Sequence, residues 1–188
     1  MNKRVLVPFS AGFEEIETVT IVDVLRRASI DVTLAALHGE RVTGRSGITV
    51  KADKTLDEAL VENSTYDMIV LPGGQPNAYA LRDDARIIDE IKNIEKNGGY
   101  TAAICAAPAA LEKAGLLGGK EATNYPSLKK DLVSCIYSEK SVVESGRVIT
   151  SRGPGTAMEF ALKLVALLKG DSISDKVAAD LVTDKIQG

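Results

Sequence analysis

The chain has 188 residues, of which 45% are hydrophobic and 26% charged, a composition typical of one folded domain over residues 1–188. A formal net charge of −3 and the lack of tryptophan argue against nucleic-acid and anionic-membrane partners. No apolar run approaches the roughly 18 residues of a membrane-spanning helix, and the two cysteines lack the spacing of a metal site or disulfide framework. We therefore expect a cytoplasmic protein with no metal or other cofactor.

Strand and helix patterns alternate along the chain. In chain order they predict a strand at Arg4–Phe9, a helix at Glu15–Ala28, a strand at Asp31–Leu37, a hairpin at Val42–Ala52, a strand at Tyr66–Leu71, a helix at Asp83–Lys96, a strand at Tyr100–Ile104, a helix at Pro108–Ala114, a short strand at Lys120–Asn124, a hairpin at Ser141–Thr150, a helix at Gly155–Lys169 and a helical or irregular end at Ile173–Ile186. In the first helix, Ile16, Val19, Val22 and Leu25 are spaced to form one apolar stripe. This alternation predicts an α/β fold with a mostly parallel sheet, helices on both faces and small β-hairpins.

Three candidate functional segments follow predicted strands directly. They are residues 10–17, the pair Gly73 and Gly74, and Cys105. Because ligands of open α/β sheets bind outside the carboxyl ends of the strands, we expect these segments to share one crevice.

Cys105 lies at a sharp turn from a buried strand into a helix that opens with Pro108. The amino end of that helix would favour the thiolate, which is the reactive form of cysteine. A small core cysteine is the competing interpretation, and position alone leaves the two about even.

An acidic cluster, Glu14, Glu15 and Glu17, stands at the start of the first helix. Acids there favour the helix dipole, so capping would explain most of the cluster. One inward-facing carboxyl would instead share a proton with the thiol as a coupled pair. Gly73 and Gly74, with the Ala106 N–H, would then form an oxyanion pocket, although Pro-Gly-Gly taken alone is a tight turn.

Four motifs in this order resemble the ThiJ/PfpI superfamily, and nearest its branch containing the Parkinson's-disease-linked deglycase and redox chaperone and its bacterial relatives. They are GFEEIE at 12–17, VLPGG at 70–74, AAICAAP at 102–108 and TSRGPGT at 150–156. The resemblance implies a flavodoxin-like three-layer sandwich and a homodimer. It also implies that Cys105 is an oxidation-sensitive nucleophile, that protonated Glu17 hydrogen-bonds to its sulfur, and that Gly73, Gly74 and Ala106 supply nearby backbone donors.

Other positions follow or depart from the family pattern. Arg27 matches an arginine near the dimer interface, and residues 151–154 match a segment near the pocket. Tyr125 stands where many relatives place a histidine beside the cysteine, and we expect it to contact substrate. The one histidine, His38, follows the second strand and is expected on the surface, away from the crevice. No Cys-His dyad is evident, which counts against a cysteine peptidase or amidase.

Two functions remain open on the sequence. The resemblance implies a glyoxalase III or deglycase-type enzyme in which Cys105 attacks methylglyoxal, glyoxal or their adducts and Glu17 is the acid and base. The alternative is an oxidative-stress sensor or redox-regulated chaperone, in which Cys105 is oxidised to sulfinate. Cys135, in a polar stretch, is interpreted as incidental to either function.

Overall fold

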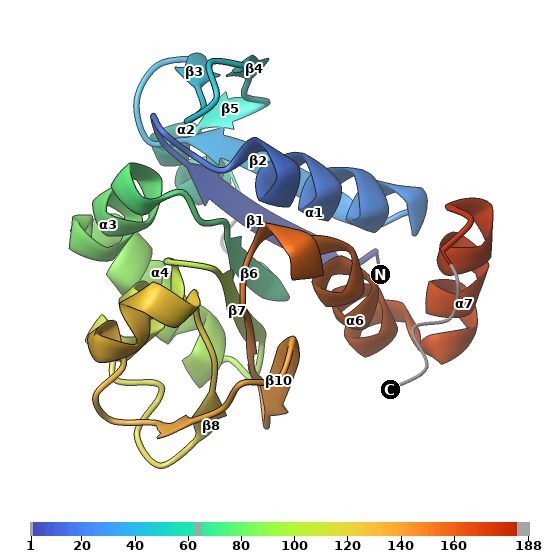
Figure 1. Cartoon of the computed structure of the whole chain (residues 1–188). Helices are drawn as coiled ribbons and strands as arrows, with labels where there is room; N and C mark the ends of the chain where they lie inside the picture. Colours follow the sequence, from blue (N-terminus) through green and yellow to red (C-terminus); the bar gives the residue numbers. More distant parts are fainter. Residues whose placement is uncertain (1, 63–64, 184–188) are drawn as a thin grey trace.

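A seven-stranded sheet, in the order β10-β11-β7-β6-β1-β2-β5, forms the centre of the computed structural model, which describes residues 2–62 and 65–183 (Figure 1). The strands are β1 (Arg4–Phe9), β2 (Asp31–Ala36), β5 (Lys54–Thr55), β6 (Met68–Leu71), β7 (Tyr100–Ile104), β10 (Val142–Ser145) and β11 (Val148–Ser151). Every neighbouring pair is parallel except β10 with β11. The five main parallel strands, numbered along the chain, have the order 2-1-3-4-5 of a flavodoxin-like sheet.

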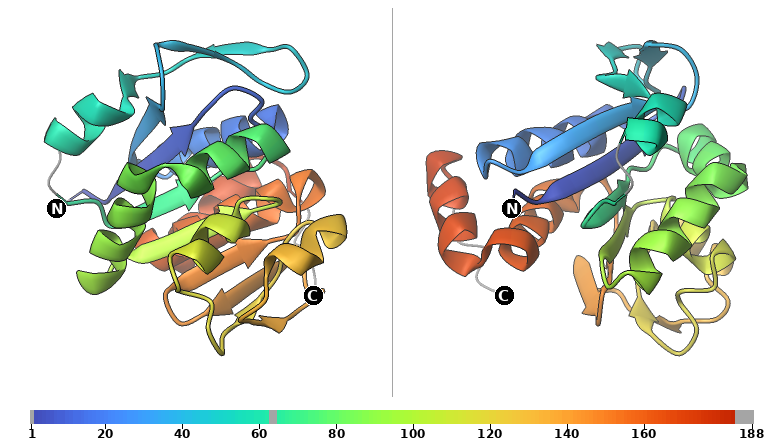
Figure 2. Two further views of the ribbon diagram at one scale, coloured as in Figure 1. Left: turned by 90° about the vertical axis from the view of Figure 1, so that its left-hand side faces the viewer. Right: turned by 180° about the vertical axis from the view of Figure 1, so that it is seen from behind.

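Helices cover both faces of this sheet, as the strand patterns predict (Figures 1 and 2). One face is covered by α1 (Glu15–Arg27) and α6 (Ala157–Lys169), with α7 (Asp171–Asp180) packed on α6. The other face is covered by α2 (Leu56–Glu62), α3 (Gln75–Asp83), α4 (Ala85–Lys96) and α5 (Pro108–Lys113). Each face buries its own apolar cluster, because strands enclosed on both sides must be apolar along their whole length.

The smaller elements agree with the two predicted hairpins. Strands β3 (Arg41–Thr43) and β4 (Thr49–Lys51) form the first, and β10 with β11 forms the second. The short strands β8 (Glu121–Ala122) and β9 (Ile136–Tyr137) pair in parallel, and 3₁₀ turns occupy η1 (Pro126–Asp131) and η2 (Pro154–Thr156).

The predicted stripe on α1 is wrong at its amino end. Ile16 and Val19 are 58% and 50% exposed, whereas Glu15, Glu17 and Thr18 are buried. The first turn of α1 passes the carboxyl edge of the sheet, where polar groups from neighbouring loops supply its partners. Its buried face therefore turns apolar only from Ile21 onward.

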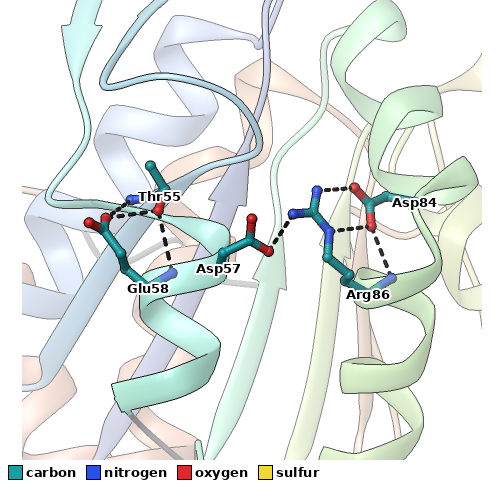
Figure 3. Close-up of polar contacts among 5 residues, drawn as sticks. All are labelled: Thr55, Asp57, Glu58, Asp84 and Arg86. Carbon is teal, nitrogen blue, oxygen red and sulfur yellow. Dashed lines mark hydrogen bonds and ion pairs between the residues drawn. The ribbon is translucent and has the colours of Figure 1, made fainter.

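The helix predicted at Asp83–Lys96 is α4, which begins at Ala85, whereas α3, which ends at Asp83, was not predicted. Asp84 separates them and caps α4 by accepting the Arg86 N–H. Arg86 also binds Asp57 of α2, so this arginine ties together two helices on the same face (Figure 3).

The chain after α6 is helical as far as Asp180, within the predicted end segment. Residues 184–186 of that prediction lie outside the described residues.

Candidate active site

The segments that follow β1, β6 and β7 meet at the carboxyl edge of the sheet. Backbone and side-chain bonds join them: Glu14 N–H donates to Gly73 O at 3.0 Å, and Gly73 N–H donates to Glu17 Oε2 at 2.7 Å. The crevice lies beside β1, which has β2 on one side and β6 on the other, so that the strand order reverses there. Open α/β sheets bind ligands at this position. The sequence-predicted residues Glu17, Gly73 and Cys105 are thus brought together.

Cys105 sits on a strained turn between β7 and α5. Its φ of +64° is in the left-handed region, which costs a non-glycine residue about 1 kcal/mol or more and is typical of a nucleophile elbow. Its N–H donates to Ser151 O and its carbonyl accepts the Tyr125 N–H, each at 2.9 Å, so the turn is held from both sides. The residue is only 8% exposed, which restricts access to small molecules.

Gly73 separates the thiol from the carboxyl of Glu17. A Cβ built on Gly73 would lie 2.5 Å from Glu17 Oε2, 2.6 Å from Cys105 Cβ and 3.1 Å from Cys105 Sγ. Only glycine fits between them, and the two acids approach each other closely for that reason. Oε1 of Glu17 is buried with no hydrogen-bond partner among the described residues, whereas Oε2 accepts the Gly73 N–H.

Burial controls the ionisation of this pair. Burial raises the pKa of Glu17 from 4.5 to about 7, against the opposing hydrogen bonds from Gly73 and Cys105. Burial, together with the charge and hydrogen bond of Glu17, raises the pKa of the Cys105 thiol to about 12. The N–H groups of Gly74 and Ala106 act to lower the thiol pKa, as the helix amino end predicts, but they are outweighed.

Glu17 and Cys105 therefore titrate as a coupled pair that loses its first proton near neutral pH. The proton that remains is shared between the carboxyl and the sulfur. The nucleophilic form is the one with the proton on Glu17 and the negative charge on Cys105.

Glu14 and Glu15 anchor the β3–β4 hairpin, and Glu15 also accepts its own backbone N–H in the first turn of α1. Glu15 Oε1 accepts the N–H groups of Ser46 at 2.7 Å and Ile48 at 3.4 Å. Burial acts to raise the pKa of Glu15, but its backbone hydrogen bonds together lower it. Glu14, which is also buried, pairs with Arg45 at 3.1 Å. The sequence pattern assigned these acids to the helix dipole and did not predict this role, because Glu15 and Ser46 are 31 residues apart in the chain.

Tyr125 lies beside the nucleophile through its backbone, and its side chain is 44% exposed. The ring lies next to Gly153, where an added Cβ would be 3.2 Å from Tyr125 Cδ2. The segment at 151–154 thus flanks the site, with Ser151 O holding Cys105 and Ser151 Oγ bonded to Ser141 O. Its backbone bond to Cys105 and its exposed ring place Tyr125 at the border of the site.

Three other residues singled out in the sequence lie away from the site. His38 is exposed after β2, which β1 and β6 separate from β7. Cys135 is partly buried against the core of the α2–α5 face, and burial and Glu112 raise its pKa. Arg27 pairs with Asp23 on the surface of α1, one turn apart.

Comparison with known proteins identifies the family of this chain. A sequence profile described as the DJ-1/PfpI family matches residues 3–167. The chain belongs to the DJ-1/PfpI family. It is 43% identical over 185 residues to Protein dj-1beta of Drosophila melanogaster, which covers 97% of this chain and 98% of that protein.

Two further members of the DJ-1/PfpI family carry informative descriptions. A Caenorhabditis elegans protein named glutathione-independent glyoxalase DJR-1.2 is 36% identical over 174 residues, 92% of this chain and 91% of that protein. The structure described as Toxoplasma gondii DJ-1, oxidized, has a TM-score of 0.90 and 42% identity, covering 96% of this chain and 98% of that one. The flavodoxin-like sandwich is therefore the fold of the family.

Residues 2–62 and 65–183 carry neither a metal-binding cluster nor a membrane-spanning helix. No group of three or more His, Cys, Asp or Glu side chains gathers there in a way that would hold a metal ion. In the same part of the chain, no helix has both the length and the apolar character needed to cross a bilayer.

Proposed function

We propose that this protein is a cysteine-dependent enzyme of the glyoxalase III or deglycase type, acting on methylglyoxal, glyoxal or their adducts. The observation that carries the proposal is the pairing of Glu17, whose pKa burial raises to about 7, with the Cys105 thiol across Gly73. A carboxyl with that pKa is suited to both give and take a proton at neutral pH. The relative named as a glutathione-independent glyoxalase supports the same choice.

The chemistry follows from the pair. The Cys105 thiolate adds to the aldehyde carbon of methylglyoxal, and the proton of Glu17 goes to the aldehyde oxygen, giving a hemithioacetal. The Glu17 carboxylate then removes the hydrogen on that carbon, and the electron pair moves onto the ketone oxygen, which gives an enediolate. The hydroxyl proton of the first carbon passes to the oxygen of the second, and Glu17 returns its proton to the second carbon, which gives a thioester of lactate. Water then hydrolyses the thioester to lactate and the thiol.

Backbone donors stabilise the negative charge that develops on oxygen. The N–H groups of Gly74 and Ala106 lie beside the sulfur and are suited to this task. The Gly73 N–H is engaged by Glu17 Oε2 and instead orients the carboxyl. No Cys-His dyad contributes, so Glu17 has to serve every proton transfer.

Lactate release from methylglyoxal by freshly reduced protein tests the proposal. We expect lactate from the wild type, none from Cys105→Ser, and a loss of about 100-fold or more in kcat for Glu17→Gln, the usual contribution of a general acid or base. His38→Ala is the control and should keep full activity, because His38 is exposed beyond β2. Lactate formation that persists in Cys105→Ser would overturn the proposal.

A redox role is the second candidate, favoured by the solved relative described in its oxidized form. We propose that, in this case, peroxide converts Cys105 to a sulfinate, which gains about 32 Da from two oxygen atoms. Cys135 belongs to the core of the opposite sheet face, so a disulfide does not compete. No lactate, combined with a stable Cys105 sulfinate, would favour this function over turnover.

We further propose a homodimer in a reducing compartment such as the cytoplasm. Ile16 and Val19 of α1 and Ile48 of the β3–β4 turn are each at least half exposed, at 58%, 50% and 58%. Exposed apolar side chains are suited to a two-fold contact in which the same surface pairs with itself. Both cysteines are free, which agrees with a reducing compartment.

A further inference from the structure

Asn77 makes three hydrogen bonds next to the active site, two of them buried and one partly buried. It is the third residue of α3 and has no exposed surface. Its Oδ1 accepts the Ser10 N–H at 2.6 Å, while its Nδ2 donates to Pro72 O at 2.8 Å and to Gly73 O at 2.9 Å. The side chain thus joins α3 to the end of β1 and to the turn that follows β6.

The two carbonyls that Asn77 holds belong to consecutive peptide groups. In the first, the Pro72 carbonyl faces Asn77 and the Gly73 N–H donates to Glu17 Oε2. In the second, the Gly73 carbonyl faces Asn77 and the Gly74 N–H is directed at the Cys105 sulfur. Each peptide group is planar and trans, so fixing the carbonyl also fixes the direction of the N–H on its opposite side.

From this geometry we propose that Asn77 is a positioning residue for the Glu17–Cys105 pair. Its amide holds both carbonyls so that one N–H meets the carboxyl and the next meets the thiol. Its Oδ1 also accepts the N–H of Ser10, at the start of the residue 10–17 segment, and so holds that segment against the same turn. This contact keeps the Glu17 carboxyl close to its donor, the Gly73 N–H. The consequence for catalysis rests on the proposed function, whereas the consequence for thiol ionisation does not.

Asparagine is the residue type that this place requires. The site needs two donors for two carbonyls and one acceptor for an N–H, all within reach of one short side chain. A leucine has a similar shape but would remove the acceptor of the Ser10 N–H and the donor to the Pro72 carbonyl, and would leave the Gly73 carbonyl with the Glu14 N–H alone. Each buried bond lost in this way is costly. The turn would then reorient to find other partners, and the donors to Glu17 and Cys105 would move with it.

The sign of the effect on ionisation follows from what the donors do. The Gly73 N–H lowers the pKa of Glu17 and the Gly74 N–H lowers the pKa of Cys105. Turning either N–H away removes a stabilising contact from the charged form. Loss of Asn77 should therefore move the ionisation of the thiol to higher pH.

The test measures the rate of Cys105 alkylation by iodoacetamide against pH, in a Cys135→Ser background. Asn77→Leu should raise the midpoint of the profile by about one pH unit. It should also lower kcat for methylglyoxal about 10-fold or more with little change in KM, since a misplaced catalytic group mainly affects the chemical step. Asn93→Leu, at an exposed position of α4, is the matched control and should leave the midpoint and kcat unchanged.

The outcomes separate positioning from simple stability. A lower melting temperature with an unchanged alkylation midpoint would overturn the proposal, because a purely structural asparagine would give that result. If Asn77→Leu does not fold, Asn77→Ser is judged by the same two measurements. A shifted midpoint in a protein without glyoxalase activity would support Asn77 as a positioning residue while refuting the proposed enzyme.

Discussion

Replacing Glu17 with glutamine should make the protein more stable at alkaline pH while it removes activity. Burial raises the pKa of this carboxyl from 4.5 to about 7. In the unfolded chain Glu17 ionises above pH 4.5, but in the folded protein it does so only above pH 7. The unfolded state therefore loses its proton first, and the free energy of unfolding falls between these two pH values.

The size of this effect follows from the difference between the two pKa values. Each pH unit of difference corresponds to about 1.4 kcal/mol, so 2.5 units, the interval from 4.5 to about 7, correspond to about 3 kcal/mol. Glutamine does not titrate, and its amide oxygen can still accept the Gly73 N–H. We expect Glu17→Gln to approach the stability of the wild type near pH 4.5 and to exceed it by up to about 3 kcal/mol above pH 7.

Urea unfolding of reduced protein at pH 5, 6, 7 and 8, at one protein concentration, measures this difference. Glu95→Gln, on the exposed surface of α4, controls for the loss of a carboxyl elsewhere. A stability difference between Glu17→Gln and the wild type that stays constant from pH 5 to pH 8 would show that Glu17 is not a buried acid with a raised pKa.

Three further changes have expected outcomes. Gly73→Ala should fold, by circular dichroism, yet lose about 100-fold or more of activity, because its Cβ would displace the atoms of Glu17 and Cys105 that lie 2.5 and 2.6 Å away. Glu15→Ala should destabilise the protein by about 1–3 kcal/mol and speed amide exchange in the β3–β4 hairpin, since two N–H groups lose their acceptor. The stabilisation by Glu15 should be present above pH 4.5 and lost as the pH falls through its lowered pKa; unchanged exchange rates would contradict the anchor. Ile16→Glu combined with Val19→Lys should give a monomer by light scattering, and a dimer that persists would exclude this face as the contact.

The sheet was predictable because each of its main strands is buried on both faces and reads as an apolar run between helical patterns. Helix α2 was missed although a sequence signal was present. Thr55 and Glu58 form a capping box, with the Thr55 N–H donating to Glu58 Oε2 and the Glu58 N–H donating to Thr55 Oγ1 (Figure 3). Its seven residues are too few to show a helical period, so the cap is the better guide to such short helices.

Within the site, spacing after the strands was sufficient to bring Glu17, Gly73 and Cys105 together. Asn77 and the hairpin anchor at Glu15 were not predictable in the same way, because each acts through a contact formed only in the folded chain. Buried polar side chains of this kind leave no periodic pattern. They become visible only when the partner of every buried backbone group is accounted for.

The unfavourable features of this fold are concentrated at one edge of the sheet. Cys105 has a left-handed backbone, and Glu17 is a carboxyl held without exposure in the core. Neither serves stability, since a glycine at the first position and a neutral side chain at the second would relieve strain and burial cost. Both persist because neighbouring hydrogen bonds hold the backbone around them: Ser151 and Tyr125 bond the Cys105 turn, and Asn77 bonds the turn after β6 that contacts Glu17. With no histidine beside the sulfur, Glu17, whose pKa burial raises to about 7, is suited to exchange protons with the thiol at neutral pH, so in the proposed enzyme this strain is the physical condition for reactivity.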